Sequence, residues 1–269
     1  MKEKGLTGFQ LKIIGLILMI FDHIYSLFGA IGNIPVVFKW AGRIVAPIFI
    51  FMTVEGYVHT RNKKKYMLRL YLASVLMSIG NDLVYKYFSR ADGAILSNNI
   101  FATLFLITLY LCIIDFIKNA MNKKSTLKIA LGVVLLILPI ALSVAFIILM
   151  SNMSNISILS YLMRLIPLPI LVEGGPLFIL IGIFMYLLRE NRKNVFIVYT
   201  IMSLALMFTG ELSIKTILFN NYQWMMVFAA PLMHLYNGQK GRGMKYLFYI
   251  FYPAHIYIFY IASSLMMKR

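Results

Sequence analysis

The stretch "QLKIIGLILMIFDHIYSLFGA", residues 10–30, decides the fold class. It is mostly apolar, and its length matches the roughly 20 residues that a helix needs to cross the hydrocarbon core of a bilayer. Two ionisable residues, Asp22 and His23, stand side by side within it. The stretch therefore predicts a membrane-spanning helix that carries a polar pair at lipid depth, where such groups usually face a cavity or a partner.

The composition of the whole chain extends this prediction to the rest of the fold. Of the 269 residues 61% are hydrophobic and 13% are charged, and the mean hydropathy is +0.83. Soluble domains are about 45–50% apolar and about 25% charged. We expect an all-α, polytopic bundle embedded in the cell (cytoplasmic) membrane, with a single domain over residues 1–269.

Apolar runs divide the chain into about nine predicted spans (between eight and ten). They cover residues 10–30, 43–59, 66–88, 99–117, 127–150, 174–189, 194–210, 222–237 and 244–266. The fold of residues 151–173 stays open, because Arg164, Pro167 and Pro169 interrupt its apolar pattern. We expect this stretch to lie at the interface or to re-enter the membrane.

The net charge of +17 fits a membrane protein better than a nucleic-acid-binding one, since no soluble basic domain or reader motif accompanies it. With the N-terminus placed inside, 17 of the 26 Lys and Arg fall in inside segments, as the positive-inside rule requires. Eight fall outside: Lys39, Arg43, Lys86, Arg90, Arg164, Lys215, Lys268 and Arg269. The charge pattern predicts an inside N-terminus and an outside C-terminus.

The candidate catalytic residues are His23, Asp22 and His255. Lys12 and His23 are 11 residues apart, which places them on one helix face, about 16 Å apart along the axis. Asp22 points about 100° away and is expected to pair with another helix. A histidine can accept a proton from a nucleophile near neutral pH. Whether His23 or His255 is the general base stays open, and a purely structural hydrogen bond is the alternative for both.

Other buried ionisable residues are predicted to line a substrate cavity, namely Arg43, Glu55 and Asp82. His59 and His234 are expected at the membrane interface. The histidines do not form an H-x-x-x-H or H-E-x-x-H pattern, and Cys112 is the single cysteine, so no metal site is predicted.

Two basic segments on the predicted cytoplasmic side suggest a ligand that carries phosphate. "YNGQKGRGMK", residues 236–245, combines three glycines with cations, so backbone N–H groups could approach an anion that the cations neutralise. "HTRNKKKYMLR", residues 59–69, is the second. Ordinary positive-inside charge with a tight turn is the alternative. The residues predicted to bind this ligand are Lys12, Arg61, Tyr236, Asn237, Lys240 and Arg242.

Four blocks of the sequence carry a family resemblance: "LKIIGLILMIFDHI", "AGRIVAPIFIFMTVEGYVHTRNKKKYMLRL", "NNIFATLFL" and "LYNGQKGRGMKYLFYIFYPAHIYIFY". Together they resemble the TraX family, named for a conjugal-transfer protein that acetylates pilin. In the wider group of transmembrane acyltransferases, ten intervening residues separate an arginine from a histidine in the first span. Lys12 and His23 have this spacing, but lysine loses the fork geometry of arginine.

The resemblance implies an acetyltransferase that moves an acetyl group from cytoplasmic acetyl-CoA through the membrane. The acceptor would be an amine or hydroxyl of a peptide, a pilin or a glycan on the outer side, with histidine as general base. The alternative is a proton-coupled transporter or flippase, whose usual internal repeats are not visible in the sequence. The sequence leaves the acceptor, N- against O-acetylation and the oligomeric state open.

Overall fold

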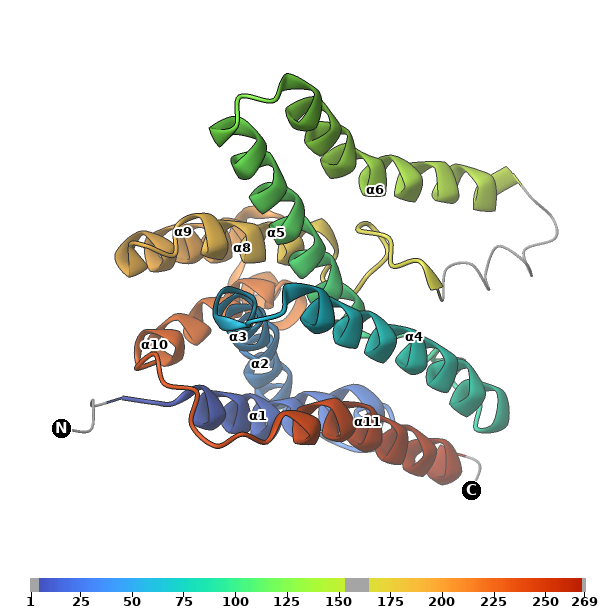
Figure 1. The fold of residues 1–269 in the computed structure, drawn as a ribbon. Helices are drawn as coiled ribbons and strands as arrows, with labels where there is room; N and C mark the ends of the chain where they lie inside the picture. The colour runs from blue at the N-terminus through green and yellow to red at the C-terminus, as the bar shows by residue number, and fades with distance from the viewer. Residues whose placement is uncertain (1–4, 153–164, 268–269) are drawn as a thin grey trace. The chain divides into compact units, whose positions relative to one another are not determined.

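The computed structural model describes residues 5–152 and 165–267, and the regular elements within these ranges are helices. Most of the stretch predicted as irregular, residues 153–164, lies outside the described residues. Leu6 and Tyr236 form an isolated parallel bridge. The prediction of an all-α fold is confirmed for the described part of the chain (Figure 1).

The element order follows the predicted spans closely over the first half of the chain. The elements are α1 (Gly8–Phe28), α2 (Val37–Arg43), α3 (Val45–His59), α4 (Lys63–Tyr87), α5 (Ile100–Asn122), α6 (Thr126–Asn152), α8 (Gly175–Leu187), α9 (Arg192–Ala205), η1 (Leu206–Phe208), η2 (Thr216–Asn220), η3 (Gln223–Phe228), α10 (Ala229–His234) and α11 (Lys245–Met267). Within the described ranges, six helical segments are long and apolar enough to cross a membrane. The chain therefore has the helices of a multi-pass membrane protein.

Three predicted spans differ from the helices found at their positions. α8 has 13 residues and α9 has 14, so each rises only about 20 Å, against a hydrocarbon core of about 30 Å. The span predicted at 222–237 is a 3₁₀ turn, η3, followed by the six-residue helix α10. The count of nine spans and the inside N-terminus therefore stay predictions.

The chain separates into two compact units, each of which is described by itself. Unit 1 comprises residues 1–52, 81–96 and 187–269, and unit 2 comprises residues 53–80 and 97–186. Helices α3 and α4 each contribute residues to both units. The single domain predicted for residues 1–269 stays a prediction.

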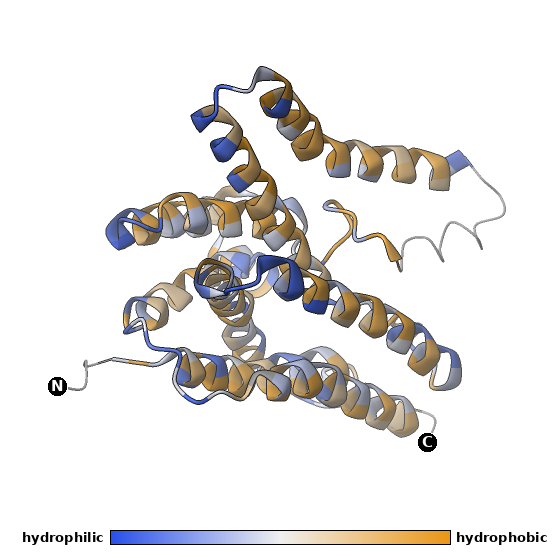
Figure 2. Ribbon diagram, viewed as in Figure 1, coloured by the Kyte–Doolittle hydropathy of each residue, from blue (hydrophilic) through white to orange (hydrophobic). Residues whose placement is uncertain are grey.

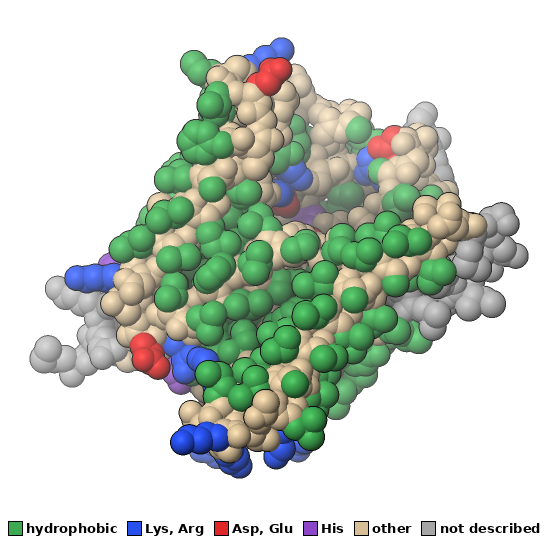
Figure 3. Space-filling view, turned by 90° about the horizontal axis from the view of Figure 1, so that it is seen from above, with side chains coloured by type: hydrophobic (Ala, Val, Ile, Leu, Met, Phe, Trp, Pro, Cys, Tyr) green, Lys and Arg blue, Asp and Glu red, His purple; other side chains and the backbone are tan. Residues whose placement is uncertain are grey.

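Unit 2 is built around α5, which is the most buried of the long apolar helices. Gly132 of α6 allows a close approach, because a Cβ there would lie 2.3 Å from Cγ1 of Ile117 in α5. Only 6% of the apolar window of α6 is buried, and its ribbon is mostly orange in Figure 2. Hydrophobic side chains also cover much of the face drawn in Figure 3, with Lys and Arg in small groups. Exposed apolar side chains over such an area are compatible with contact to the lipid of a membrane.

Unit 1 rests on the packing of α1 against α11, which lie side by side in Figure 1. Phe9 contacts Phe248 near the start of both helices, and Phe28 contacts Phe259 further along. The order of these contacts shows that the two helices run in the same direction. The start of α1 is fixed by a capping box, in which Thr7 and Gln10 satisfy each other's backbone N–H groups.

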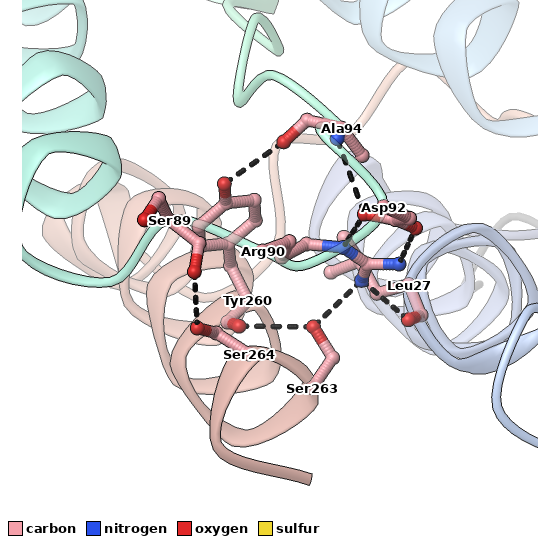
Figure 4. Close-up of polar contacts among 8 residues, drawn as sticks. All are labelled: Leu27, Ser89, Arg90, Asp92, Ala94, Tyr260, Ser263 and Ser264. Carbon is pink, nitrogen blue, oxygen red and sulfur yellow. Dashed lines mark hydrogen bonds and ion pairs between the residues drawn. The ribbon is translucent and has the colours of Figure 1, made fainter. Parts of the chain in front are cut away.

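Arg90, in the loop after α4, ties the far ends of these two helices together (Figure 4). Its Nη1 donates to the carbonyl oxygen of Leu27 at 2.6 Å and to Oγ of Ser263 at 2.7 Å. Nε and Nη2 donate to the two carboxylate oxygens of Asp92 at 3.0 and 2.6 Å. Leu27 lies in the last turn of α1, where carbonyl groups have no partner within the helix. Arg90 therefore caps α1, bridges it to α11 and keeps its own charge paired.

Arg90→Gln is expected to lower the free energy of unfolding by about 3 kcal/mol, because hydrogen bonds from a charged donor contribute about 1.5–3 kcal/mol each. The measurement is the thermal unfolding midpoint of the full-length protein in detergent. Lys86→Gln is the matched control, since Lys86 is an exposed cation in the last turn of α4. An equal loss of stability in both variants would contradict the capping role of Arg90.

The Arg90–Asp92 pair also predicts a pH dependence of stability. Hydrogen bonds from Arg90, helped by the backbone N–H of Ala94, lower the pKa of Asp92 to about 2. The unfolded carboxyl titrates near 3.9, so the stabilisation is complete above about pH 4 and is lost between about pH 4 and pH 2. The unfolding midpoint of wild type should exceed that of Asp92→Asn at pH 6, and the difference should shrink towards zero at pH 2. A difference that is constant with pH would rule out this linkage.

Candidate functional site

The candidate site centres on two buried histidines that face each other between α1 and α11. Nε2 of His255 lies 3.0 Å from Nδ1 of His23, and the ring centroids are 4.8 Å apart. Only 5% of His23 and 6% of His255 is exposed. Both residues were predicted as site residues from the sequence. Their contact was not predicted, because 232 positions separate them.

The hydrogen bonds of this pair fix which nitrogen atoms carry protons. Nδ1 of His255 lies 2.7 Å from the carbonyl oxygen of Phe251, which can only accept, so this nitrogen must be the donor. Nε2 of a neutral His255 is then an acceptor. Nδ1 of His23 must therefore be protonated, and it also lies 3.0 Å from the carbonyl oxygen of Met19. This leaves the lone pair of His23 on Nε2, which makes no hydrogen bond within the described part of the chain.

Aromatic side chains hold the ring of His255 in place. Phe251 stacks on it with a centroid separation of 5.0 Å, and Tyr252 and Phe259 meet it edge-on at 5.9 and 6.0 Å. The ring therefore has little freedom to turn away from His23. His255 is suited to orient its neighbour, and His23 presents a free basic nitrogen.

Asp22 pairs with α2, as the sequence predicted for a side chain that points away from the His23 face. Its Oδ1 lies 3.1 Å from Nη2 of Arg43 and 3.4 Å from Nζ of Lys39. Nη1 of Arg43 donates to Oε1 of Gln223 at 3.0 Å, which links the pair to η3. Gly42 permits this close packing, because a Cβ there would lie 2.3 Å from Cγ of Asp22.

The glycine-rich loop lies against the N-terminal end of α1. The backbone N–H groups of Gly8 and Phe9 donate to the carbonyl oxygens of Gln239 and Lys240 at 2.8 and 3.0 Å. Gly241 has a φ of +70° and approaches Thr7 so closely that a Cβ would lie 2.7 Å from its Oγ1. The loop is thereby held at the same end of α1 as Lys12.

Basic side chains gather at this end of unit 1. Nζ of Lys12 lies 5.1 Å from the ring centroid of Phe248 and is close enough to Lys240 for the two cations to repel each other. Lys240 and Arg242 are exposed. Tyr236 is buried, and its carbonyl oxygen accepts from Nη1 of Arg192 at 2.7 Å. Asn237 accepts from the backbone N–H of Gln239, so Tyr236 and Asn237 shape the loop.

Lys12 and His23 both contact α11, which confirms that they share one face of α1.

The other predicted site residues lie in different places. Asp82, in α4, belongs to unit 1 and lies close enough to Tyr257 of α11 to interact with it. Glu55 and Arg61 belong to unit 2. There Oε2 of Glu55 lies 3.8 Å from Nδ1 of His59, and Arg61 is exposed. Their predicted roles beside the histidines stay untested.

Unit 2 contains a second polar cluster, which was not predicted from the sequence. Asp115 of α5 accepts hydrogen bonds from the hydroxyl of Tyr57 at 2.9 Å, from Nζ of Lys63 at 2.6 Å and from the hydroxyl of Tyr186. A lone acid in an otherwise apolar run was the available signal. Both oxygens of the carboxylate accept from these donors, which is the pattern of a structural anchor.

The fold and the site thus define a multi-pass helical membrane protein with a buried histidine pair between two parallel helices. The family model described as TraX protein matches residues 7–263, so the chain belongs to the TraX family and the resemblance predicted from the sequence is confirmed. The chain is also 27% identical over 262 residues to the probable fimbrial assembly protein FimC, serogroup H1, of Dichelobacter nodosus, and the match covers 93% of each chain. No solved structure matches it.

The geometry of the histidine pair predicts a specific protonation pattern. At pH 7.5, Nδ1 should be protonated and Nε2 unprotonated in His23, with His255 in the same tautomer. Nitrogen NMR of the full-length protein with labelled histidine, assigned by His23→Gln and His255→Gln, measures this directly. His234 is exposed and makes no hydrogen bond within the described residues, so it serves as the internal reference. A proton on Nε2 of His23 at that pH would contradict the arrangement.

Proposed function

We propose that this chain is a membrane-embedded acetyltransferase that uses acetyl-CoA and transfers the acetyl group to an amine or hydroxyl on the outer side. The observation that carries the proposal is the free Nε2 of His23, held in one tautomer by a second buried histidine. Membership of the TraX family supports it. The name of the fimbrial relative makes a pilin one of the candidate acceptors, beside other peptides and glycans.

The proposal includes the predicted topology, with about nine spans in the cytoplasmic membrane and an inside N-terminus. The parallel course of α1 and α11 supports opposite sides for the two ends of the chain. In this orientation Lys12 lies near the cytoplasm. His23 lies about 16 Å further along α1, past the midplane, between the donor and the acceptor.

Acetyl-CoA would place its phosphate groups at the basic end of unit 1. Lys12 and Lys240 repel each other there, and an anion between them would relieve this repulsion. Arg242 adds a third cation, and the glycines of residues 238–243 allow close backbone approach. Tyr236 and Asn237 hold the loop in shape. Arg61 stays a further candidate for this role. The thioester arm would then run along the α1 face towards His23.

The chemical step is an acyl transfer with His23 as general base. Nε2 of His23 takes the proton from the acceptor nitrogen or oxygen while that atom attacks the thioester carbonyl carbon. The carbon–sulfur bond breaks, and the imidazolium returns the proton to the departing CoA thiolate. His255 acts as a positioning residue, because it keeps the proton of His23 on Nδ1.

The other predicted site residues have supporting roles in this proposal. Asp22 holds Arg43 beside the site, and Arg43 positions the acceptor. Glu55 and Asp82 are proposed to line the substrate path. None of these four residues exchanges a proton with substrate.

His23→Ala should lower acetyl transfer by about 10²–10⁴-fold, the usual contribution of a general base. The measurement is release of CoA and labelling of an acceptor panel by radioactive acetyl-CoA, with the purified full-length protein in lipid nanodiscs. His255→Ala should also reduce the rate, because the tautomer of His23 is then less constrained.

His59→Ala is the matched control, since His59 is exposed and lies in the other unit. Binding of acetyl-CoA is measured in parallel and should survive His23→Ala. Full activity of His23→Ala would overturn the assigned base. Failure of wild type to bind acetyl-CoA would overturn the acetyltransferase and favour a transporter.

A further inference from the structure

Residues 206–221, between α9 and η3, form a closed loop that lies entirely within unit 1. Nδ2 of Asn221 donates to the carbonyl oxygen of Leu206 at 2.7 Å and to Oγ1 of Thr209 at 3.3 Å, so the two ends of the loop are joined. The backbone of residues 209–213 is irregular. We name this segment the 206–221 loop.

Both tryptophans of the chain hold the 206–221 loop in place. Nε1 of Trp40, in α2, donates to the carbonyl oxygen of Leu218 at 2.8 Å, and Nε1 of Trp224, in η3, donates to that of Ile217 at 3.0 Å. An indole ring combines an apolar body with a polar N–H group, and tryptophan is therefore enriched where a membrane meets water. The loop is thus held by the side chains that are typical of this boundary.

The loop exposes large apolar side chains although its backbone is irregular. Phe208, Leu212 and Ile214 are 69%, 65% and 80% exposed. Side chains of this kind are more stable in an apolar phase than in water. The irregular backbone, by contrast, needs hydrogen-bond partners, which the hydrocarbon core of a membrane does not supply. The boundary between hydrocarbon and headgroups supplies both.

The exposed apolar surface of the loop continues a stripe on α9. Ile197, Ile201 and Leu204 recur at helical spacing and are exposed, and Phe208 follows four residues after Leu204. An exposed apolar stripe on a helix of a multi-pass membrane protein is suited to contact with lipid. The same surface runs from the helix into the loop without a break.

The length of α9 also places the loop at this boundary. α9 begins at Arg192 and Lys193, and charged side chains are disfavoured within the hydrocarbon core. Its 14 residues rise about 20 Å, and the three residues of η1 add about 6 Å. Together these lengths come close to the core thickness of about 30 Å. The loop then starts where the core ends, which is the outer leaflet in the predicted topology.

We propose that the 206–221 loop is a membrane-surface anchor that binds phospholipid. Its backbone lies among the lipid headgroups of one leaflet, and Phe208, Leu212 and Ile214 insert between the acyl chains. Lys215 is exposed next to Ile214 and contacts lipid phosphate, because its apolar stem can follow the inserted side chains while its ammonium group stays in the headgroup layer. This role does not depend on the proposed acetyl transfer.

An anchor at this position sets the depth of the candidate site in the membrane. η3 follows the loop directly, and Gln223 of η3 accepts a hydrogen bond from Arg43, which pairs with Asp22. The loop therefore fixes how far the Asp22–Arg43 pair, and His23 beside it, lie below the membrane surface.

The experiment measures the depth of a nitroxide spin label on Ile214→Cys, in the full-length protein reconstituted into phosphatidylcholine vesicles. Cys112 is the single cysteine, so the background is Cys112→Ala. Collisions of the label with oxygen, which partitions into lipid, and with a water-soluble nickel chelate give the depth. The label should lie about 5–10 Å into the boundary between headgroups and acyl chains. Because Ile214 is exposed, its substitution leaves the packed part of unit 1 unchanged.

Two labelled variants in the same background serve as references. Gln239→Cys lies in an exposed part of the glycine-rich loop and marks water. Ile137→Cys lies near the middle of α6, on an exposed apolar surface, and marks the hydrocarbon core. The label on Ile214→Cys should give a depth between these two references.

If the label on Ile214→Cys meets the nickel chelate as often as the label on Gln239→Cys, the loop lies in water and the anchor is overturned. A depth equal to that of Ile137→Cys would place the loop in the hydrocarbon core and overturn it as well. Protection from both oxygen and nickel would assign the apolar surface to a protein partner or a second copy of this chain, and not to lipid. None of these measurements uses acetyl transfer, so a failure of the proposed function is seen separately.

Discussion

The parallel contact between α1 and α11 is the constraint on which unit 1 depends. It is made at three levels: Phe9 and Lys12 meet Phe248, His23 meets His255, and Arg90 joins Leu27 to Ser263. The histidine contact alone would not fix the relative height of the helices, since a single hydrogen bond contributes only about 0.5–1.5 kcal/mol net. Contacts on both sides of the histidine pair prevent α1 and α11 from sliding past each other. A slide by one helical turn, about 5.4 Å, would break the 3.0 Å contact between the two rings.

Within this frame, polar groups are divided between two tasks. The two histidines are neutral: each donates from Nδ1, and Nε2 of His255 accepts from His23. Neutral rings need no counter-ion in an apolar setting. Asp22 and its two cations are charged, so they lie where a fifth of each side chain still reaches the surface. Full burial of such charges would cost several kcal/mol each. The difference in burial explains why two adjacent residues, Asp22 and His23, can have unrelated environments.

The sequence predicted most of the long helices, the common face of Lys12 and His23, and a separate partner for Asp22. These follow from the apolar content and from the 3.6-residue period, which are properties of single helices. It did not predict the contact of His23 with His255 or the bridging role of Arg90, because tertiary neighbours leave no local pattern. In the sequence, Arg90 is one of eight cations in the predicted outside segments and has no feature that sets it apart. Helices α8, α9 and α10 are shorter than the spans predicted at 174–189, 194–210 and 222–237, because apolar content continues past the residues that end each helix.

The discontinuous make-up of unit 1 has a consequence for how the protein is made. Unit 2 ends at residue 186, so all of it can be synthesised before residues 187–269 appear. Unit 1 needs residues from both ends, and the loop at 235–241 must return to pair with residues 6–9. His255 follows His23 by 232 positions, so His23 is synthesised well before the residue that contacts it. The histidine pair can form only once α11 has inserted beside α1, and a chain that lacks α11 would contain His23 without the neighbour that keeps its proton on Nδ1.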